Sequence, residues 1–125
     1  MLDHVTFGVS DFARSCAFYD RALHPLGVSR LFEMSDGGVS VAGYGDDRPW
    51  FWIAAQDATH GKLHIALTAS DRHAVDSFHR AAIAAGGRDN GAPGPRPHYH
   101  AHYYAAFVLD PDGHNIEAVF GNDRP

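Results

Sequence analysis

Two short stretches of this chain follow one pattern: LHIALTASD at residues 63–71 and DHVTFGVSD at residues 3–11. With an offset of 60 residues, His4 aligns with His64, and the Ser-Asp pair at 10–11 aligns with the pair at 70–71. The match continues downstream with identities and one close apolar exchange: Phe18 with Phe78, Ala22 with Ala82, Gly27 with Gly87, and Leu23 with Ile83. A single duplication of this kind predicts two copies of one supersecondary unit.

Each copy begins with alternating apolar residues, which is the period of a strand with one buried face. The aligned histidine lies on the opposite face of that strand. A Ser or Asp then caps a predicted helix, which ends at Pro25 and Gly27 in the first copy and at Gly86-Gly87 in the second. Further strands are predicted at residues 28–34, 39–44, 50–55, 102–109 and 115–120, whereas three prolines and two glycines between Gly91 and Pro97 predict an irregular loop.

The composition is that of a soluble globular protein, with 125 residues of which 45% are hydrophobic and 20% charged. The net charge of −5 argues against a nucleic-acid partner, because phosphate binding requires a basic face. No signal peptide and no apolar run of membrane-spanning length are present, so we expect a cytoplasmic protein with no membrane contact. The single cysteine, Cys16, is expected as a small buried helix residue rather than a nucleophile.

Three residues of metal-ligand type lie on predicted strand faces that point away from the helices: His4, His64 and Glu117. If the two copies pair about a pseudo-twofold axis, His4 and His64 meet across it. Two imidazoles and one carboxylate form the ligand set of non-haem iron sites, and the set also suits zinc, nickel or manganese. The alternative is that each is a surface or pocket residue that binds no metal.

Several motifs together resemble the vicinal oxygen chelate superfamily: the paired units, His4 in DHV, His64 in HIAL, and DPDG at residues 110–113 before Ile116-Glu117. That superfamily includes glyoxalase I, extradiol dioxygenases, and the fosfomycin- and bleomycin-resistance proteins. The resemblance implies an α+β fold: one domain over residues 1–125, in which two βαβββ modules, about 1–56 and 62–121, form a curved mixed sheet. It also implies His4, His64 and Glu117 as metal ligands, and a homodimer. Ligands that converge within one chain and ligands shared between two chains both stay open.

The chain departs from glyoxalase I at a fourth ligand, a glutamate on the last strand of the first module. Alternation along residues 50–53 leaves Trp52 in the pocket-facing position. Because an indole can neither bind a metal nor accept a proton, Glu117 would be the only carboxylate available as the catalytic base. Trp52 is expected either as an aromatic wall of the substrate pocket or as a core aromatic.

A run of histidines and tyrosines, HYHAHYY, occupies residues 98–104. We predict that His102, Tyr103 and Tyr104 line the substrate pocket, where a histidine or tyrosine can act as an acid or base beside the ion. The alternative is an exposed polar edge strand.

These features favour a metal-dependent lyase or isomerase similar to lactoylglutathione lyase, in which a divalent Fe, Ni, Zn or Mn ion chelates two neighbouring oxygens of a small-molecule substrate. Two alternatives stay open: a metal-free drug-binding protein of the bleomycin-resistance type, and a small ring-cleaving dioxygenase. No arginine or lysine cluster singles out glutathione or a phosphonate as the substrate. We interpret the scattered basic residues as solvated surface: Arg30, Arg48, Lys62, Arg88 and Arg96.

Overall fold

Each copy of the repeat folds into a strand and a helix whose first turn is capped by an aspartate. The computed structural model describes residues 2–122. Asp11 caps helix α1 (Phe12–Ala22), and Asp71 caps helix α2 (Arg72–Ala84), each by accepting a hydrogen bond from a backbone amide three residues on. The predicted helix starts are therefore confirmed. Neither of these helices is long and apolar enough to cross a membrane, and the described residues contain no other helix that is.

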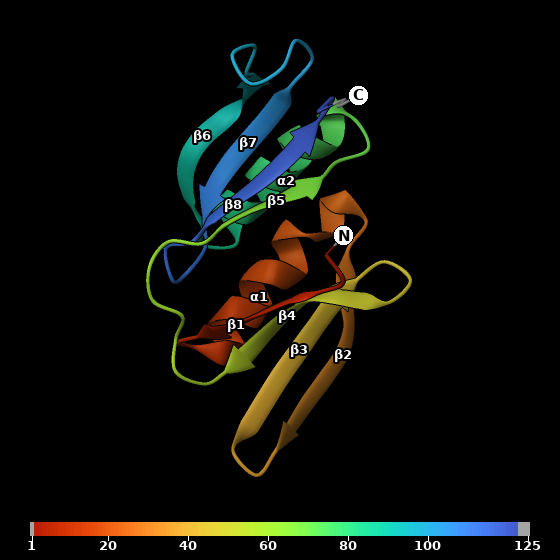
Figure 1. Ribbon diagram of the computed structural model, residues 1–125. Coiled ribbons are helices and arrows are strands. Elements are labelled where there is room, and N and C mark those ends of the chain that lie inside the picture. Colours follow the sequence, from red (N-terminus) through yellow and green to blue (C-terminus); the bar gives the residue numbers. More distant parts are fainter. Residues whose placement is uncertain (1, 123–125) are drawn as a thin grey trace.

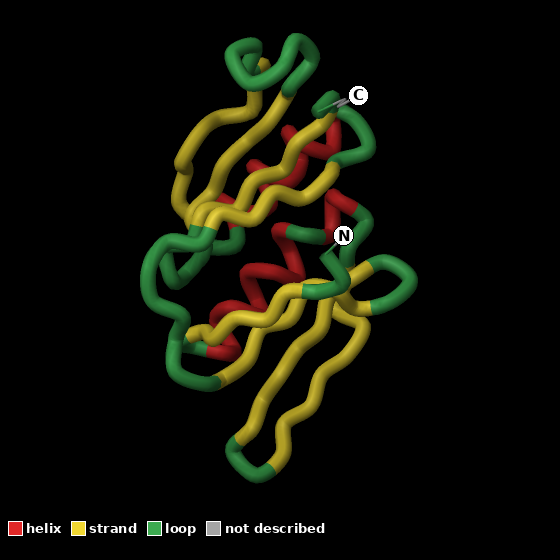
Figure 2. The backbone as a smooth tube through the Cα atoms, in the orientation of Figure 1, coloured by secondary structure: helices red, strands yellow, loops and turns green. Residues whose placement is uncertain are grey.

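Two open four-stranded sheets carry the helices, one in each half of the chain (Figures 1 and 2). The strand orders are β1-β4-β3-β2 and β5-β8-β7-β6, with parallel pairing of β1 with β4 and of β5 with β8 and antiparallel pairing elsewhere. The elements are β1 (Val5–Val9), η1 (a 3₁₀ turn, His24–Leu26), β2 (Ser29–Asp36), β3 (Val39–Gly45), β4 (Pro49–Ala55), β5 (His64–Thr68), β6 (Arg88–Pro95), β7 (Tyr104–Leu109) and β8 (Asn115–Phe120). The predicted α+β class with two βαβββ modules is confirmed. Within the single chain the two sheets are separate, and β1 and β5 are edge strands.

Strand β6 contradicts the prediction of an irregular loop between Gly91 and Pro97. It pairs antiparallel with β7, with one register shift on each side of Gly91, whose φ is +155°. Prolines fit here because β6 is the edge strand of its sheet and loses no inner ladder bond to them. The chain from residue 96 to 103 then forms the turns that precede β7.

The larger of two hydrophobic core clusters in the described residues joins the two modules. Its largest fully buried side chains come from both halves of the chain: Tyr19, Tyr44, Phe18, Phe51 and Phe78. Helices α1 and α2 contact each other, and Phe18 lies so close to Gly87 that a Cβ there would be 2.7 Å from its ring. The modules are therefore packed together although their sheets are not paired.

The Asp110-Pro111-Asp112-Gly113 turn connects the second module to the first. Asp110 is buried and accepts a hydrogen bond from the Tyr19 hydroxyl on α1 at 2.5 Å, while Asp112 accepts from the side chain and backbone of Ser10. Next to the turn, the His114 ring lies 5.6 Å from the Phe7 ring on β1 and accepts a hydrogen bond from the Leu63 amide at 3.2 Å. These contacts place the carboxyl end of β1 beside the start of β5.

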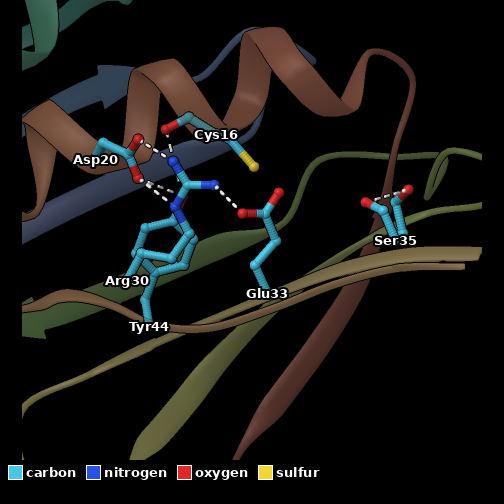
Figure 3. Close-up of polar contacts among 7 residues, drawn as sticks. Cys16, Asp20, Arg30, Glu33, Ser35 and Tyr44 are labelled. Carbon is cyan, nitrogen blue, oxygen red and sulfur yellow. Dashed lines mark hydrogen bonds and ion pairs between the residues drawn. The ribbon is translucent and has the colours of Figure 1, made fainter.

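The polar cluster drawn in Figure 3 attaches the β2–β3 hairpin to α1. Arg30 on β2 pairs with Asp20 on the helix at 2.6 Å and with Glu33 at 3.2 Å, and Tyr44 donates to Asp20 at 2.9 Å. Cys16 lies beside this cluster, and burial raises the pKa of its thiol. The cluster lies on the helix side of its sheet, and the buried thiol agrees with the structural interpretation of Cys16.

Candidate functional site

Glu117 is the centre of the candidate site. It lies on β8 between Ala66 of β5 and Phe107 of β7, on the sheet face opposite helix α2. The Nε2 atom of His64 lies 2.6 Å from Glu117 Oε1, and the Tyr103 hydroxyl donates a hydrogen bond to Oε2. The structure thus brings three of the predicted site residues into direct contact.

The carboxylate of Glu117 is buried, and its basic neighbour is a histidine rather than a lysine or arginine. The residue is 1% exposed, and within residues 2–122 no lysine or arginine forms an ion pair with it. A buried ionised carboxylate is costly unless it is paired with a cation or coordinates a metal. The imidazole and carboxylate donors that meet here suit Zn²⁺, Fe²⁺, Ni²⁺ or Mn²⁺.

A pocket of about 580 Å³ opens beside Glu117 and His64. The turns at residues 96–103 supply much of its wall, through His98, Tyr99, His100 and Tyr103. The wall is held together by aromatic contacts, since the Tyr99 ring lies 5.1 Å from that of Tyr103. Two histidines of the HYHAHYY run therefore line the pocket.

The structure places the other two predicted pocket residues of this run, His102 and Tyr104, elsewhere. The Tyr104 hydroxyl donates to Asp76 on helix α2 at 2.7 Å, and this hydrogen bond raises the pKa of Tyr104. Tyr104 therefore faces the helix. It is the first residue of β7, and side chains along this strand alternate between the helix face and the pocket face from Tyr104 onward. His102 is exposed in the preceding turn and is not part of the pocket wall.

His4 lies apart from the other two predicted ligands. It precedes β1, is exposed, and its Nδ1 lies 2.8 Å from Asp3, a hydrogen bond that lowers the pKa of Asp3. Among residues 2–122 no three His, Cys, Asp or Glu side chains lie together as a metal-binding group. The module contacts explain this separation. Phe7 on β1 packs near the start of β5, whereas His4 lies about 10 Å from Phe7 toward the N-terminal end of the strand.

Trp52 lies on the face of the first sheet that points away from α1. Its indole lies across Gly43 on β3, where a Cβ would be 2.8 Å from the ring, and it reaches Phe32 on β2 with ring centroids 5.6 Å apart. Phe32 is 45% exposed. An aromatic surface therefore occupies this face of the first sheet, and Phe32 and Gly43 had no local sequence signal that linked them to Trp52.

Comparison with known proteins agrees with this architecture. The profile of the Glyoxalase/Bleomycin resistance protein/Dioxygenase superfamily matches residues 1–118. A glyoxalase/bleomycin resistance protein from Albidiferax ferrireducens T118 is 33% identical over 98% of both chains, with a TM-score of 0.75. Comparison with curated proteins gives no match.

Two further solved structures share the fold at lower identity. Glyoxalase I from Zea mays is 22% identical with a TM-score of 0.72, and the alignment covers 99% of this chain and 46% of the maize chain. The fosfomycin resistance protein FosX from Listeria monocytogenes, solved as an E126Q mutant with Mn(II) and a dihydroxypropylphosphonic acid, is 20% identical over 98% and 93% of the two chains, with a TM-score of 0.72. On the profile match and the 33% identical relative, the chain belongs to the Glyoxalase/Bleomycin resistance protein/Dioxygenase superfamily.

Proposed function

We propose that this protein is a metal-dependent lyase or isomerase of the glyoxalase type, which acts on a small molecule with two neighbouring oxygens. The observation that carries the proposal is Glu117, a buried carboxylate in contact with the imidazole of His64 and without a lysine or arginine partner among the described residues. His64, Glu117 and His4 would hold the ion, which acts as a Lewis acid on the substrate oxygens.

The protein's own side chains have separate roles in this proposal. Glu117 is the catalytic base, because it is the only carboxylate that residues 2–122 contribute to the pocket wall. Tyr103 orients the Glu117 carboxylate through its hydrogen bond to Oε2, so that Oε1 faces His64. The turns at residues 96–103 shield this carboxylate from water.

We propose that His4 reaches the site from a second copy of the chain. Within one chain the module contacts hold His4 away from Glu117, and β1 and β5 are both edge strands. A twofold homodimer can place the β1 edge of each chain beside the β5 edge of its partner, which would complete two equal sites.

The first experiment is elemental analysis of untagged protein purified without a metal column, beside the variants His64→Ala and Glu117→Gln. We expect about one divalent ion per chain in the wild type and loss of the ion in both variants, because each removes one ligand. His73→Ala is the matched control, since His73 is an exposed histidine on α2 outside this pocket. Wild-type protein that binds no ion after incubation with Fe²⁺, Ni²⁺, Mn²⁺ or Zn²⁺ would contradict the proposal.

Mixed dimers test whether the site is shared. His4→Ala and Glu117→Ala are each expected to lack metal and activity toward a hemithioacetal of a 2-oxoaldehyde. The two variants are mixed at equal amounts, unfolded together and refolded, so that half of the dimers contain one chain of each variant. Each mixed dimer has one intact site and one site that lacks both residues. About a quarter of the wild-type metal content should therefore return. Recovery of none would place all three ligands within one chain.

The aromatic surface supports a second candidate function, a metal-free binding protein of the bleomycin-resistance type. Trp52 and the exposed Phe32 offer a flat apolar surface to an aromatic ligand, and the net charge of −5 favours a cationic one. Tight binding of bleomycin that is unchanged in Glu117→Gln, together with absence of metal, would select this function over catalysis.

A further inference from the structure

A row of paired residues crosses the second sheet on the face that carries His64. His64 on β5 pairs with Asn115 on β8, which pairs with Leu109 on β7, which pairs with Arg88 on β6. Because residues paired in register lie on the same face, the side chains of Arg88, Asn115 and His64 project to one side of the sheet. Three gaps between strands separate the ends of this row, a Cα distance of about 14 Å.

A second pocket, of about 600 Å³, lies along this row. Its lining includes Lys62, Arg88, Asn90 and Asn115, and it shares His64 with the pocket that holds Glu117. The two pockets therefore meet at His64, so one molecule can extend past this side chain from the Glu117 carboxylate into the second pocket.

The wall of this second pocket contains more cationic than anionic side chains. Within residues 2–122 the side chains of Lys62 and Arg88 form no ion pair and no hydrogen bond. The one acid in the described pocket wall, Asp112, already accepts two hydrogen bonds from Ser10, and the nearby Asp89 pairs with His79 at 2.9 Å, which lowers the pKa of Asp89. Two cations without partners beside amide donors provide the groups that bind an oxyanion.

The Asn90 side chain adds a positioned donor. Its Nδ2 donates to Asn115 Oδ1 at 3.3 Å, which orients the Asn115 amide group so that its own nitrogen remains available in the pocket. The pocket therefore combines two flexible cations with an ordered amide pair, all outside the residues assigned above to metal or base.

We propose that this pocket binds an anionic group of the substrate, a carboxylate or a phosphoryl group, through Lys62 and Arg88. The inference rests on the proposed function and names the substrate class: a small molecule with two neighbouring oxygens at His64 and Glu117, and an oxyanion several bonds away. Neutral 1,2-dicarbonyl adducts without such a group would be poor substrates.

The test is a titration of chelator-treated, uniformly ¹⁵N-labelled protein with inorganic phosphate and, separately, with acetate, at constant pH and ionic strength. Amide shifts are expected to concentrate at residues 61–64, 88–90 and 113–115. Arg88→Gln should weaken binding about tenfold, because a charge-assisted hydrogen bond is lost, and Lys62→Gln should act in the same direction. The matched control is Arg14→Gln, which removes the same charge from an exposed arginine on α1 and should leave affinity unchanged.

The two probes distinguish the sources of the oxyanion. Tighter binding of phosphate indicates a phosphoryl substrate, and equal or tighter binding of acetate indicates a carboxylate. Affinity that is unchanged in a folded Arg88→Gln, or that falls equally in Arg14→Gln, would overturn the inference. The protein in this titration carries no metal, so Arg88-dependent anion binding can be detected even if elemental analysis finds no metal site. Conversely, elemental analysis can establish the metal site even if this pocket binds no anion.

Discussion

Glu117 depends on Tyr103 for one of the two hydrogen bonds that compensate its burial. Tyr103→Phe keeps the ring and removes the donor, so Oε2 of a buried carboxylate loses its partner. We expect the free energy of unfolding to fall by about 1.5–3 kcal/mol, measured by urea denaturation of metal-free protein. Tyr99→Phe is the control, because Tyr99 belongs to the same turns but is 59% exposed. A loss in Tyr99→Phe as large as in Tyr103→Phe would show that the hydroxyl of Tyr103 has no special role.

Gly43 allows Trp52 to lie flat on the sheet. A Cβ at residue 43 would be 2.8 Å and 2.9 Å from two ring atoms, so Gly43→Ala must displace the indole and break its contact with Phe32. In a Trp50→Phe background, we expect red-shifted Trp52 fluorescence and weaker binding of aromatic ligands. Gly94→Ala is the control, since a Cβ there would meet only the flexible end of Arg96, at 3.2 Å. Unchanged Trp52 emission in Gly43→Ala would contradict the assigned indole position.

Much of the site could be anticipated residue by residue, but only where the strand boundaries were right. Alternation correctly grouped Glu117 with His64, because β8 begins at the predicted residue. The predicted pocket included both Tyr103 and Tyr104, whereas only Tyr103 lies in the pocket wall: β7 begins two residues later than predicted, and the preceding turns set the direction of Tyr103. A change of one residue in strand phase moves a side chain from the pocket to the helix face.

At the scale of single elements, the Asp110 turn holds the modules together through Tyr19. Burial raises the pKa of Tyr19 well above its usual value, and the nearby Asp110 carboxylate adds to the effect. The hydrogen bond therefore contributes stability that is fully present below about pH 10, the unfolded-state pKa, and is lost only as pH rises through the higher folded-state value.

Tyr19→Phe tests this contact. We expect a loss of about 1.5–3 kcal/mol in the free energy of unfolding, constant between pH 6 and pH 9, because Tyr19 stays protonated in both states over that range. Urea denaturation at several pH values provides the measurement. A difference between wild type and variant that vanishes below pH 9 would contradict the assignment.

Strand β6 shows why element prediction failed in one place. Its glycines and prolines have the composition of a loop, yet they form an edge strand because β7 offers a partner and bulges absorb the poor fit. Sequence composition reports local preference only, whereas pairing with β7 depends on residues further along the chain. The same limit hid the proposed anion pocket, since Lys62 and Arg88 are brought together only by the strand order.

At the scale of the molecule, the two sheets are separate but the core is continuous, so the chain should unfold as one unit. The repeat provides a matched pair of variants, because Phe18 and Phe78 are equivalent residues and both are fully buried. Phe18→Ala and Phe78→Ala should each lower the free energy of unfolding by about 3–5 kcal/mol. Both tryptophans lie on β4 in the first module, so their fluorescence reports on that module alone.

The decisive comparison is the effect of Phe78→Ala on tryptophan fluorescence. If the modules unfold together, this variant in the second module shifts the fluorescence transition of the first, and that transition coincides with the far-ultraviolet circular dichroism transition of the whole chain. Protein concentration is held constant, because dimerisation would also shift the midpoint. A fluorescence transition that Phe78→Ala leaves in place would show that the modules unfold independently, and the contacts of Tyr19 and Phe18 across the boundary would then contribute little to stability.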